Sequence, residues 1–161
     1  MAVETIGFGG GCHWCTEAVF AALRGVGRVE QGFIRSEPPD DNWSEAVRLG
    51  FDPAEIARDV LIEVHLRTHA STSNHSMRGK YRSAVYVGDA AQGKAARDAL
   101  GRLQAGFDRP LVTRVLSLAE FRASEERFQN YHEKRAGGPF CTRYIDPKLH
   151  MLQAAFAPHL R

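Results

Sequence analysis

The chain has 161 residues, 43% of them hydrophobic and 25% charged, which suits a single domain over residues 1–161 with a sizeable core. Its 21 basic and 19 acidic residues give a formal net charge of +2, too balanced to indicate nucleic acid as a partner. We also expect no membrane partner and no secretory signal, because no segment holds the roughly 20 apolar residues of a membrane span and the N-terminus carries Glu4 without a basic start.

Strand and helix patterns alternate along the chain, without repeats or low-complexity tracts. Apolar runs predict strands at residues 3–8, 26–34, 45–51, 81–87 and 111–118. Helical spacing and capping signals predict helices between Cys12 and Gly25, from Asp52 to about residue 65, at 89–104, at 119–135, and from Asp146 onward. Residues 68–80 are polar and aperiodic, and loops of this length are often functional.

Cys12 and Cys15 form a C-x-x-C pair directly after three glycines, where a predicted strand gives way to a predicted helix. A helix N-terminus carries unpaired N–H groups and a partial positive charge, which stabilise a thiolate. We place the chain in the cytoplasm, where thiols stay reduced, so three cysteines indicate chemistry or a metal rather than structural disulfides. A buried cysteine in a tight turn is the alternative, but the glycines and the neighbouring thiol favour a reactive Cys12.

A C-x-x-C pair also forms half of many zinc sites. The rest of the chain offers no second pair at such spacing, because Cys141 stands alone and the seven histidines show no convincing partner spacing. His65 and His69 are four residues apart, but they lie where a helix runs into a loop and we expect them to be exposed. We therefore expect no bound metal or other cofactor. The alternative, a metal-binding module, would use Cys12, His13, Cys15 and Cys141.

The run GFGGGCHWCTEAVF resembles the active-site signature of class A methionine sulfoxide reductases. The resemblance continues, in the family's order, through QGF (31–33), EAVRLGFDP (45–53), KYRSAVY (80–86), AEF (119–121), QNYHEK (129–134) and FCTRYIDPKL (140–149). It implies an α+β fold with a two-layer ferredoxin-like (split βαβ) core, additional helices and long loops. It also implies reduction of methionine-S-sulfoxide, free or in peptides and proteins, by a monomeric enzyme with thioredoxin as its reductant.

The resemblance assigns roles to four residues of the candidate site. Cys12 would attack the sulfoxide sulfur, release methionine and become a sulfenic acid. Trp14 would line an apolar pocket for the methyl group of the substrate. Glu45 would protonate the sulfoxide oxygen, and Tyr81 would hydrogen-bond the same oxygen.

A second thiol must then form a disulfide with Cys12, which an external reductant opens. Cys141 stands where many family members carry their resolving cysteine, after the flexible pair Gly137 and Gly138, and we prefer it for this role. Cys15 would be either a second relay thiol or a packed neighbour. A general thiol–disulfide oxidoreductase remains an alternative, and it would use Cys12 and Cys15 alone.

Three positions depart from the family pattern. His13 replaces an aromatic residue, so one wall of the methyl pocket becomes polar, and a protonated imidazole there could stabilise the thiolate. Phe33 replaces a tyrosine, which removes one hydroxyl hydrogen bond to the substrate. In the loop HSMRGKYRS, residues 75–83, Ser76 stands where the family has an aspartate. We expect His75 or Ser76 to supply the lost polar contacts.

Overall fold

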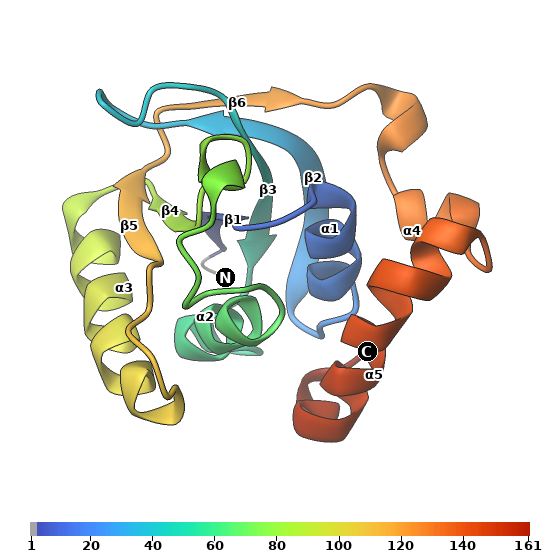
Figure 1. Cartoon of the computed structure of the whole chain (residues 1–161). Coiled ribbons are helices and arrows are strands. Elements are labelled where there is room, and N and C mark those ends of the chain that lie inside the picture. The colour runs from blue at the N-terminus through green and yellow to red at the C-terminus, as the bar shows by residue number, and fades with distance from the viewer. Residues whose placement is uncertain (1–2) are drawn as a thin grey trace.

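The computed structural model describes residues 3–161 (Figure 1). Residues 1–2, which belong to the expected domain of residues 1–161, lie outside the described residues. The strands are β1 (Glu4–Gly9), β2 (Val26–Arg35), β3 (Ser44–Phe51), β4 (Ala84–Val87), β5 (Arg114–Ser117) and β6 (Glu120–Ala123). The helices are α1 (His13–Ala21), α2 (Arg58–Arg67), α3 (Ala90–Leu103), α4 (Tyr131–Arg135) and α5 (Asp146–Ala155). Short turns of helix are η1 (Ser76–Gly79), η2 (Gln104–Gly106), η3 (Glu126–Phe128), η4 (Cys141–Ile145) and η5 (Ala157–His159).

The strands form one six-stranded sheet in the order β5-β4-β1-β3-β2-β6. Neighbouring strands are antiparallel except β4 and β5, which are parallel. Helices α1, α2 and α3 cover one face of the sheet, and α4 and α5 lie beside α1 (Figure 1). The mixed α+β class expected from the sequence is therefore confirmed.

The main core lies between the sheet and these helices. Period-two alternation turns Ile6 and Phe8 of β1 toward it, and both side chains are fully buried. Phe8 stacks on Phe20 of α1 with ring centroids 4.5 Å apart, which fixes the helix directly after the glycine turn. A smaller cluster around Ile34 and Tyr86 covers the opposite face. None of the helices in the described part of the chain is long and apolar enough to cross a membrane.

The predicted helix over residues 119–135 is wrong, because most of this segment is edge strand and turn. Strand β6 pairs with β2, and Gly32 of β2 leaves room for it: a Cβ on Gly32 would lie 2.2 Å from the Arg122 carbonyl oxygen. Asn130 then adopts a left-handed conformation, with φ 55°, before the short α4 begins. Sheet pairing and this reversal override the helical spacing of the sequence.

Two other elements, α2 and β4, begin later in the chain than the sequence predicts. Helix α2 begins at Arg58 rather than Asp52, because the Asp52 carboxylate closes a turn on the Ala54 N–H at 2.9 Å and Ile56 is buried beyond it. Strand β4 begins at Ala84, so Tyr81 lies in the preceding loop and not in a strand as predicted. Residue 81 is thereby held by loop contacts rather than by the sheet.

Candidate active site

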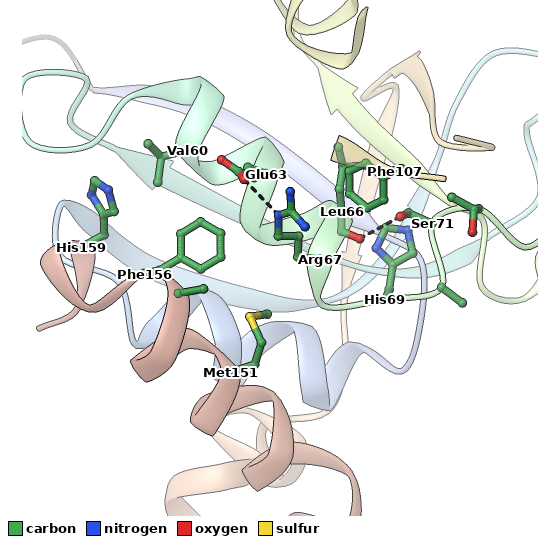
Figure 2. Close-up of a pocket in the computed structure, with 13 residues that line it drawn as sticks. Val60, Glu63, Leu66, Arg67, His69, Ser71, Phe107, Met151, Phe156 and His159 are labelled. Atoms are coloured by element: carbon green, nitrogen blue, oxygen red, sulfur yellow. Dashed lines mark hydrogen bonds and ion pairs between the residues drawn. The ribbon is translucent and has the colours of Figure 1, made fainter. Parts of the chain in front are cut away.

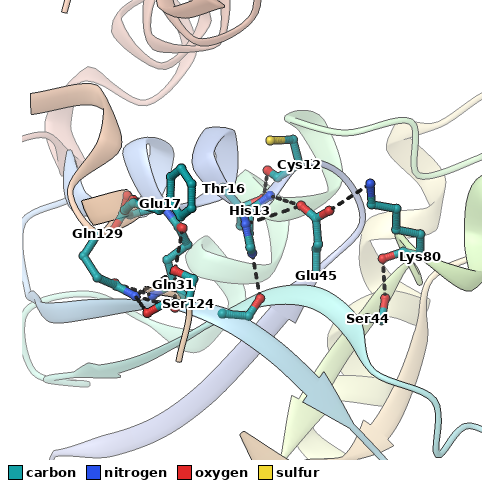
Figure 3. A network of polar contacts seen from close by, with 12 residues as sticks. Cys12, His13, Thr16, Glu17, Gln31, Ser44, Glu45, Lys80, Ser124 and Gln129 are labelled. Carbon is teal, nitrogen blue, oxygen red and sulfur yellow. Dashed lines mark hydrogen bonds and ion pairs between the residues drawn. The ribbon is translucent and has the colours of Figure 1, made fainter. Parts of the chain in front are cut away.

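Cys12 lies where the glycine-rich end of β1 meets the first turn of α1 (Figure 3). Its carbonyl oxygen accepts the first hydrogen bonds of the helix, from the Cys15 N–H at 3.1 Å and the Thr16 N–H at 3.2 Å. The Cys12 side chain is half-buried, at the positive end of the helix dipole. The sequence prediction of a thiol at a helix N-terminus is confirmed.

The thiols of Cys12 and Cys15 are made unequal by their surroundings. A hydrogen bond from the Cys15 thiol and the backbone N–H groups of Trp14 and Cys15 lower the pKa of Cys12, against the opposing effects of burial and the Glu45 charge. The same hydrogen bond, burial and the charge of Cys12 raise the pKa of Cys15. The lowered pKa of Cys12 and the raised pKa of Cys15 make Cys12 the more acidic thiol of the pair.

Cys141 joins the same cluster from the C-terminal part of the chain. It is fully buried at the start of η4 and packs with Cys15, and Cys12 borders this cluster. All three cysteines are free thiols. Burial, followed by the charge of Asp146, raises the pKa of Cys141, so this thiol is less acidic than Cys12. Three thiols are thus gathered in one place, although one of them is far away in the sequence.

An ammonium group approaches the thiols from α5. Lys148 is half-buried and donates a hydrogen bond to the Thr68 carbonyl oxygen. Burial lowers the pKa of Lys148, and the charges of Cys15 and Cys12 act in the opposite direction. The sequence patterns do not single out Lys148. Its position in the FCTRYIDPKL block after Cys141 is the one signal that could have done so.

Glu45 of β3 lies beside the start of α1 with only 8% of its surface exposed. One carboxylate oxygen, Oε1, accepts the His13 backbone N–H at 3.2 Å and lies 3.6 Å from Nε2 of the His13 ring. The other oxygen, Oε2, lies 3.6 Å from the Lys80 ammonium nitrogen. Figure 3 shows this carboxylate next to Cys12, and its charge acts on the Cys12 thiol. The structure therefore brings the Glu45 carboxylate and the Cys12 thiol together.

Trp14 belongs to an aromatic cluster formed with the C-terminal part of the chain. Its ring stacks on Tyr131, with centroids 4.1 Å apart and an interplanar angle of 4°, and meets Phe140 edge-on at 5.2 Å. The indole N–H is buried and has no hydrogen-bond partner among residues 3–161. One face of Trp14 is thus covered by a residue from the same segment that carries Cys141.

Phe33 and Tyr81 border the site from different elements. Phe33 is half-buried on β2 and meets the His13 ring edge-on, with centroids 5.2 Å apart. Tyr81 is half-buried, with the Lys80 ammonium 5.2 Å from its ring centroid. The centroids of the His13 and Trp14 rings are 6.3 Å apart. The imidazole is therefore a polar ring beside the aromatic rings of Phe33 and Trp14.

His75 and Ser76 are exposed at the start of η1. The His75 ring nitrogen Nδ1 accepts the Met77 N–H at 3.2 Å, which caps this turn. Arg78, half-buried, ties the loop to the glycine turn by donating to the carbonyl oxygens of Gly10 at 2.9 Å and Tyr81 at 3.0 Å. A substrate contact by His75 or Ser76 stays a prediction.

A buried carboxylate next to the site was not predicted from the sequence. Glu17 of α1 is 2% exposed, and its oxygens accept hydrogen bonds from Gln31 Nε2 at 3.0 Å and from the backbone N–H groups of Asn130 and Tyr131 at 2.8 and 3.0 Å. Gln129 completes the network by donating to the Gln31 carbonyl oxygen at 2.8 Å (Figure 3). Glu17 thereby anchors the segment that covers Trp14. An acidic residue on an otherwise apolar helix is the signal for it.

The expected exposure of His65 and His69 is wrong. His65 is 2% exposed, and its Nε2 lies 2.7 Å from the Gly9 carbonyl oxygen, while His69 Nε2 lies 2.8 Å from the Ser83 hydroxyl. Gly10 makes this packing possible, because a Cβ there would lie 2.5 Å from the His69 ring. Burial lowers the pKa of both histidines, that of His69 to about 4, so both are neutral supports beneath the glycine turn.

A cavity of about 670 Å³ opens between α2, the loop that follows it, and the end of α5 (Figure 2). Met151 and Phe156 line it from the C-terminal side, and an ion pair between Arg67 and Glu63 lines it from α2. Cys12 is not among its lining residues. In residues 3–161, no group of three or more His, Cys, Asp or Glu side chains is arranged to hold a metal ion. The three cysteines therefore lie at the thiol site and not in this cavity.

The chain is similar in sequence to known proteins over nearly its whole length. The family model described as peptide methionine sulfoxide reductase matches residues 4–159. The peptide methionine sulfoxide reductase MsrA of Deinococcus radiodurans is 34% identical over 176 residues, covering 99% of this chain and 85% of that protein. The crystal structure of Mxr1 from Saccharomyces cerevisiae in reduced form has a TM-score of 0.72 and 20% identity, covering 84% of this chain and 87% of that chain. Mxr1 in complex with Trx2 has a TM-score of 0.62 and 18% identity, covering 78% and 83% of the two chains. The chain belongs to the peptide methionine sulfoxide reductase family.

Proposed function

We propose that this chain reduces methionine-S-sulfoxide, free or in peptides and proteins, with Cys12 as nucleophile and Glu45 as proton donor. The observation that carries the proposal is the Cys12 thiol, with its lowered pKa, at the start of α1, where the Glu45 carboxyl group lies beside it and Trp14 follows two residues later. The Cys12 sulfur attacks the sulfoxide sulfur while Glu45 donates a proton to the sulfoxide oxygen. Methionine leaves with two more electrons, and the oxygen remains on Cys12 as a sulfenic acid.

Cys141 is proposed to resolve this sulfenic acid. Its thiol attacks the Cys12 sulfur, a disulfide forms and water leaves. The shared cluster of Cys141, Cys15 and Cys12 supports this step, because little rearrangement brings the third thiol to the first. Cys15 is proposed to act earlier, since its thiol donates the hydrogen bond that stabilises the Cys12 thiolate.

Trp14 and Phe33 are proposed to form the apolar wall for the substrate methyl group, and Tyr81 to hydrogen-bond the sulfoxide oxygen. Thioredoxin is the proposed reductant of the disulfide, and the fold shared with Mxr1, which has been crystallised in complex with Trx2, supports it. We propose a monomer working in the cytoplasm, where dithiol reductants keep thiols reduced. No organic cofactor is needed, because the thiols supply both electrons.

The finer fold assignment is also a proposal. Strand order β4-β1-β3-β2, all antiparallel, with α1 after β1 and α2 after β3, supports a ferredoxin-like (split βαβ) core in which β5 and β6 extend the two edges. One continuous sheet with a shared main core supports a single domain.

The test is turnover of the separate S and R diastereomers of a blocked methionine sulfoxide, with dithiothreitol as reductant. Dithiothreitol removes the need for a particular protein partner, so the assay reports on the sulfoxide chemistry alone. We expect reduction of the S form only. Reduction of neither form, together with rapid reduction of a small disulfide, would instead favour the general thiol–disulfide oxidoreductase.

A further inference from the structure

The two ring nitrogens of His13 face different partners. Its Nδ1 lies 2.7 Å from the Gly32 carbonyl oxygen, which can only accept a hydrogen bond. The network therefore assigns a hydrogen to Nδ1, and this bond fixes the orientation of the ring. Nε2 is then left facing Oε1 of Glu45 at 3.6 Å, and the His13 side chain is only 8% exposed.

Both side-chain oxygens of Glu45 face N–H or ammonium groups. Oε1 accepts the His13 backbone N–H, and Oε2 faces the Lys80 ammonium at 3.6 Å. A proton donor to a sulfoxide must nevertheless have a proton when the substrate arrives. Two titratable side chains face Glu45 at the same distance of 3.6 Å, the exposed Lys80 ammonium at Oε2 and the buried His13 ring at Oε1, and only His13 approaches from within the protein.

We propose that His13 is a positioning residue that stores the proton which Glu45 delivers. The inference rests on the proposed sulfoxide reduction. In the imidazolium form the Nε2–H bond breaks and an O–H bond forms on Glu45, which then passes the proton to the sulfoxide oxygen. The electron pair comes from the Cys12 thiolate, and neutral His13 regains its proton from water after methionine leaves. A shortening of the 3.6 Å separation to hydrogen-bond distance is all that the first transfer requires.

The charged groups around His13 differ in their effect on an imidazolium. The charged and titratable groups on the surrounding elements are Cys12, Cys15 and Glu17 of α1, Glu45 of β3, Lys80 before β4, and Arg122 of β6. Glu17 is occupied by Gln31 and two backbone N–H groups, and the Arg122 guanidinium lies 5.2 Å over the Phe33 ring. Negative charge on Cys12 and Glu45 favours the imidazolium, and Lys80 opposes it.

The experiment measures single-turnover release of methionine without reductant, from pH 5.5 to 9, in the full chain. His13→Asn keeps an N–H group for the Gly32 carbonyl but has no titrating nitrogen, and His13→Phe restores the aromatic residue of the family pattern. We expect the rate of the wild type to fall at alkaline pH, and this fall to move about one pH unit lower in both variants. The rates of the variants at pH 8 would then be about tenfold below wild type and at pH 5.5 within about twofold. His150→Asn, an exposed histidine of α5, is the matched control and should leave the profile unchanged.

A second experiment measures the same methionine release in Glu45→Gln, with and without His13→Asn. If His13 acts through Glu45, adding His13→Asn to Glu45→Gln should slow methionine release no further, because the two residues form one unit. An unmoved alkaline fall in both His13 variants would overturn the inference and leave His13 as a wall of the pocket. A wild type that releases no methionine at any pH would overturn the proposed function itself, so the two failures are distinguishable.

Discussion

Cys12 at the start of α1 and Cys141 in the C-terminal segment, residues 129–145, are attached to the rest of the fold in different ways. The first is fixed to the sheet through buried groups, with His13 bound to the Gly32 carbonyl and Glu45 bound to the His13 N–H. The second consists mostly of exposed residues, and a few side chains attach it to α1. Cys12, the proposed nucleophile, is therefore attached to the sheet through buried contacts, and Cys141 is carried on a more exposed segment.

Those few contacts are specific. Tyr131 stacks on Trp14, and Glu17 accepts the N–H groups of Asn130 and Tyr131. Gly137 adopts a φ of 82°, with open space around it, just before the turn that buries Cys141. The proposed mechanism thus places the attacking thiol on a segment fixed to the sheet and the resolving thiol on a more exposed segment. Each region can be tested by removing what distinguishes it.

The largest expected difference is between the two cysteines that these regions carry. Cys12→Ser should release no methionine, because a serine hydroxyl is not ionised here and cannot replace the thiolate. Cys141→Ser should still release one methionine per chain and then stall with thioredoxin, because the sulfenic acid lacks its resolving thiol. Quantified methionine release per chain, with and without thioredoxin, measures both. Normal cycling of the Cys141 variant would transfer the resolving role to Cys15.

A smaller effect is expected from Glu17→Gln, which keeps the shape of the side chain but removes its charge. The amide would place an NH2 group, which cannot accept, where one carboxylate oxygen now accepts from N–H donors, so we expect a loss of about 1–3 kcal/mol in the free energy of unfolding. Urea denaturation measures this loss. Faster hydrogen exchange at Asn130 and Tyr131, with the amides of α1 unchanged, would show that the C-terminal segment loosens first. Glu63→Gln, an exposed i,i+4 ion-pair partner of Arg67 on α2, serves as control.

The two regions also differ in how well the sequence predicts them. The strand–glycine–helix arrangement around Cys12 follows from local signals, and the structure agrees with them. The path of residues 119–135 does not follow, because pairing of β6 with β2 and the reversal at Asn130 depend on contacts with distant parts of the chain. The positions of Glu17 and Lys148 beside the site are not predicted for the same reason, because their hydrogen-bond partners lie far away in the sequence. His65 was misjudged because helical spacing does not reveal that a glycine turn packs over it.

The smallest expected effect concerns His65 and His69, which pack beneath the glycine turn before Cys12. Burial lowers the pKa of His65 and His69, that of His69 to about 4, whereas both titrate near 6.5 when the chain is unfolded. The unfolded chain therefore binds more protons below pH 6.5, and the free energy of unfolding should fall as the pH drops from 6.5 toward 4. Urea denaturation across this range measures the slope, and His69→Asn should reduce it without changing the slope above pH 7. A His69 variant with an unchanged acid slope would show that this histidine does not report on the turn.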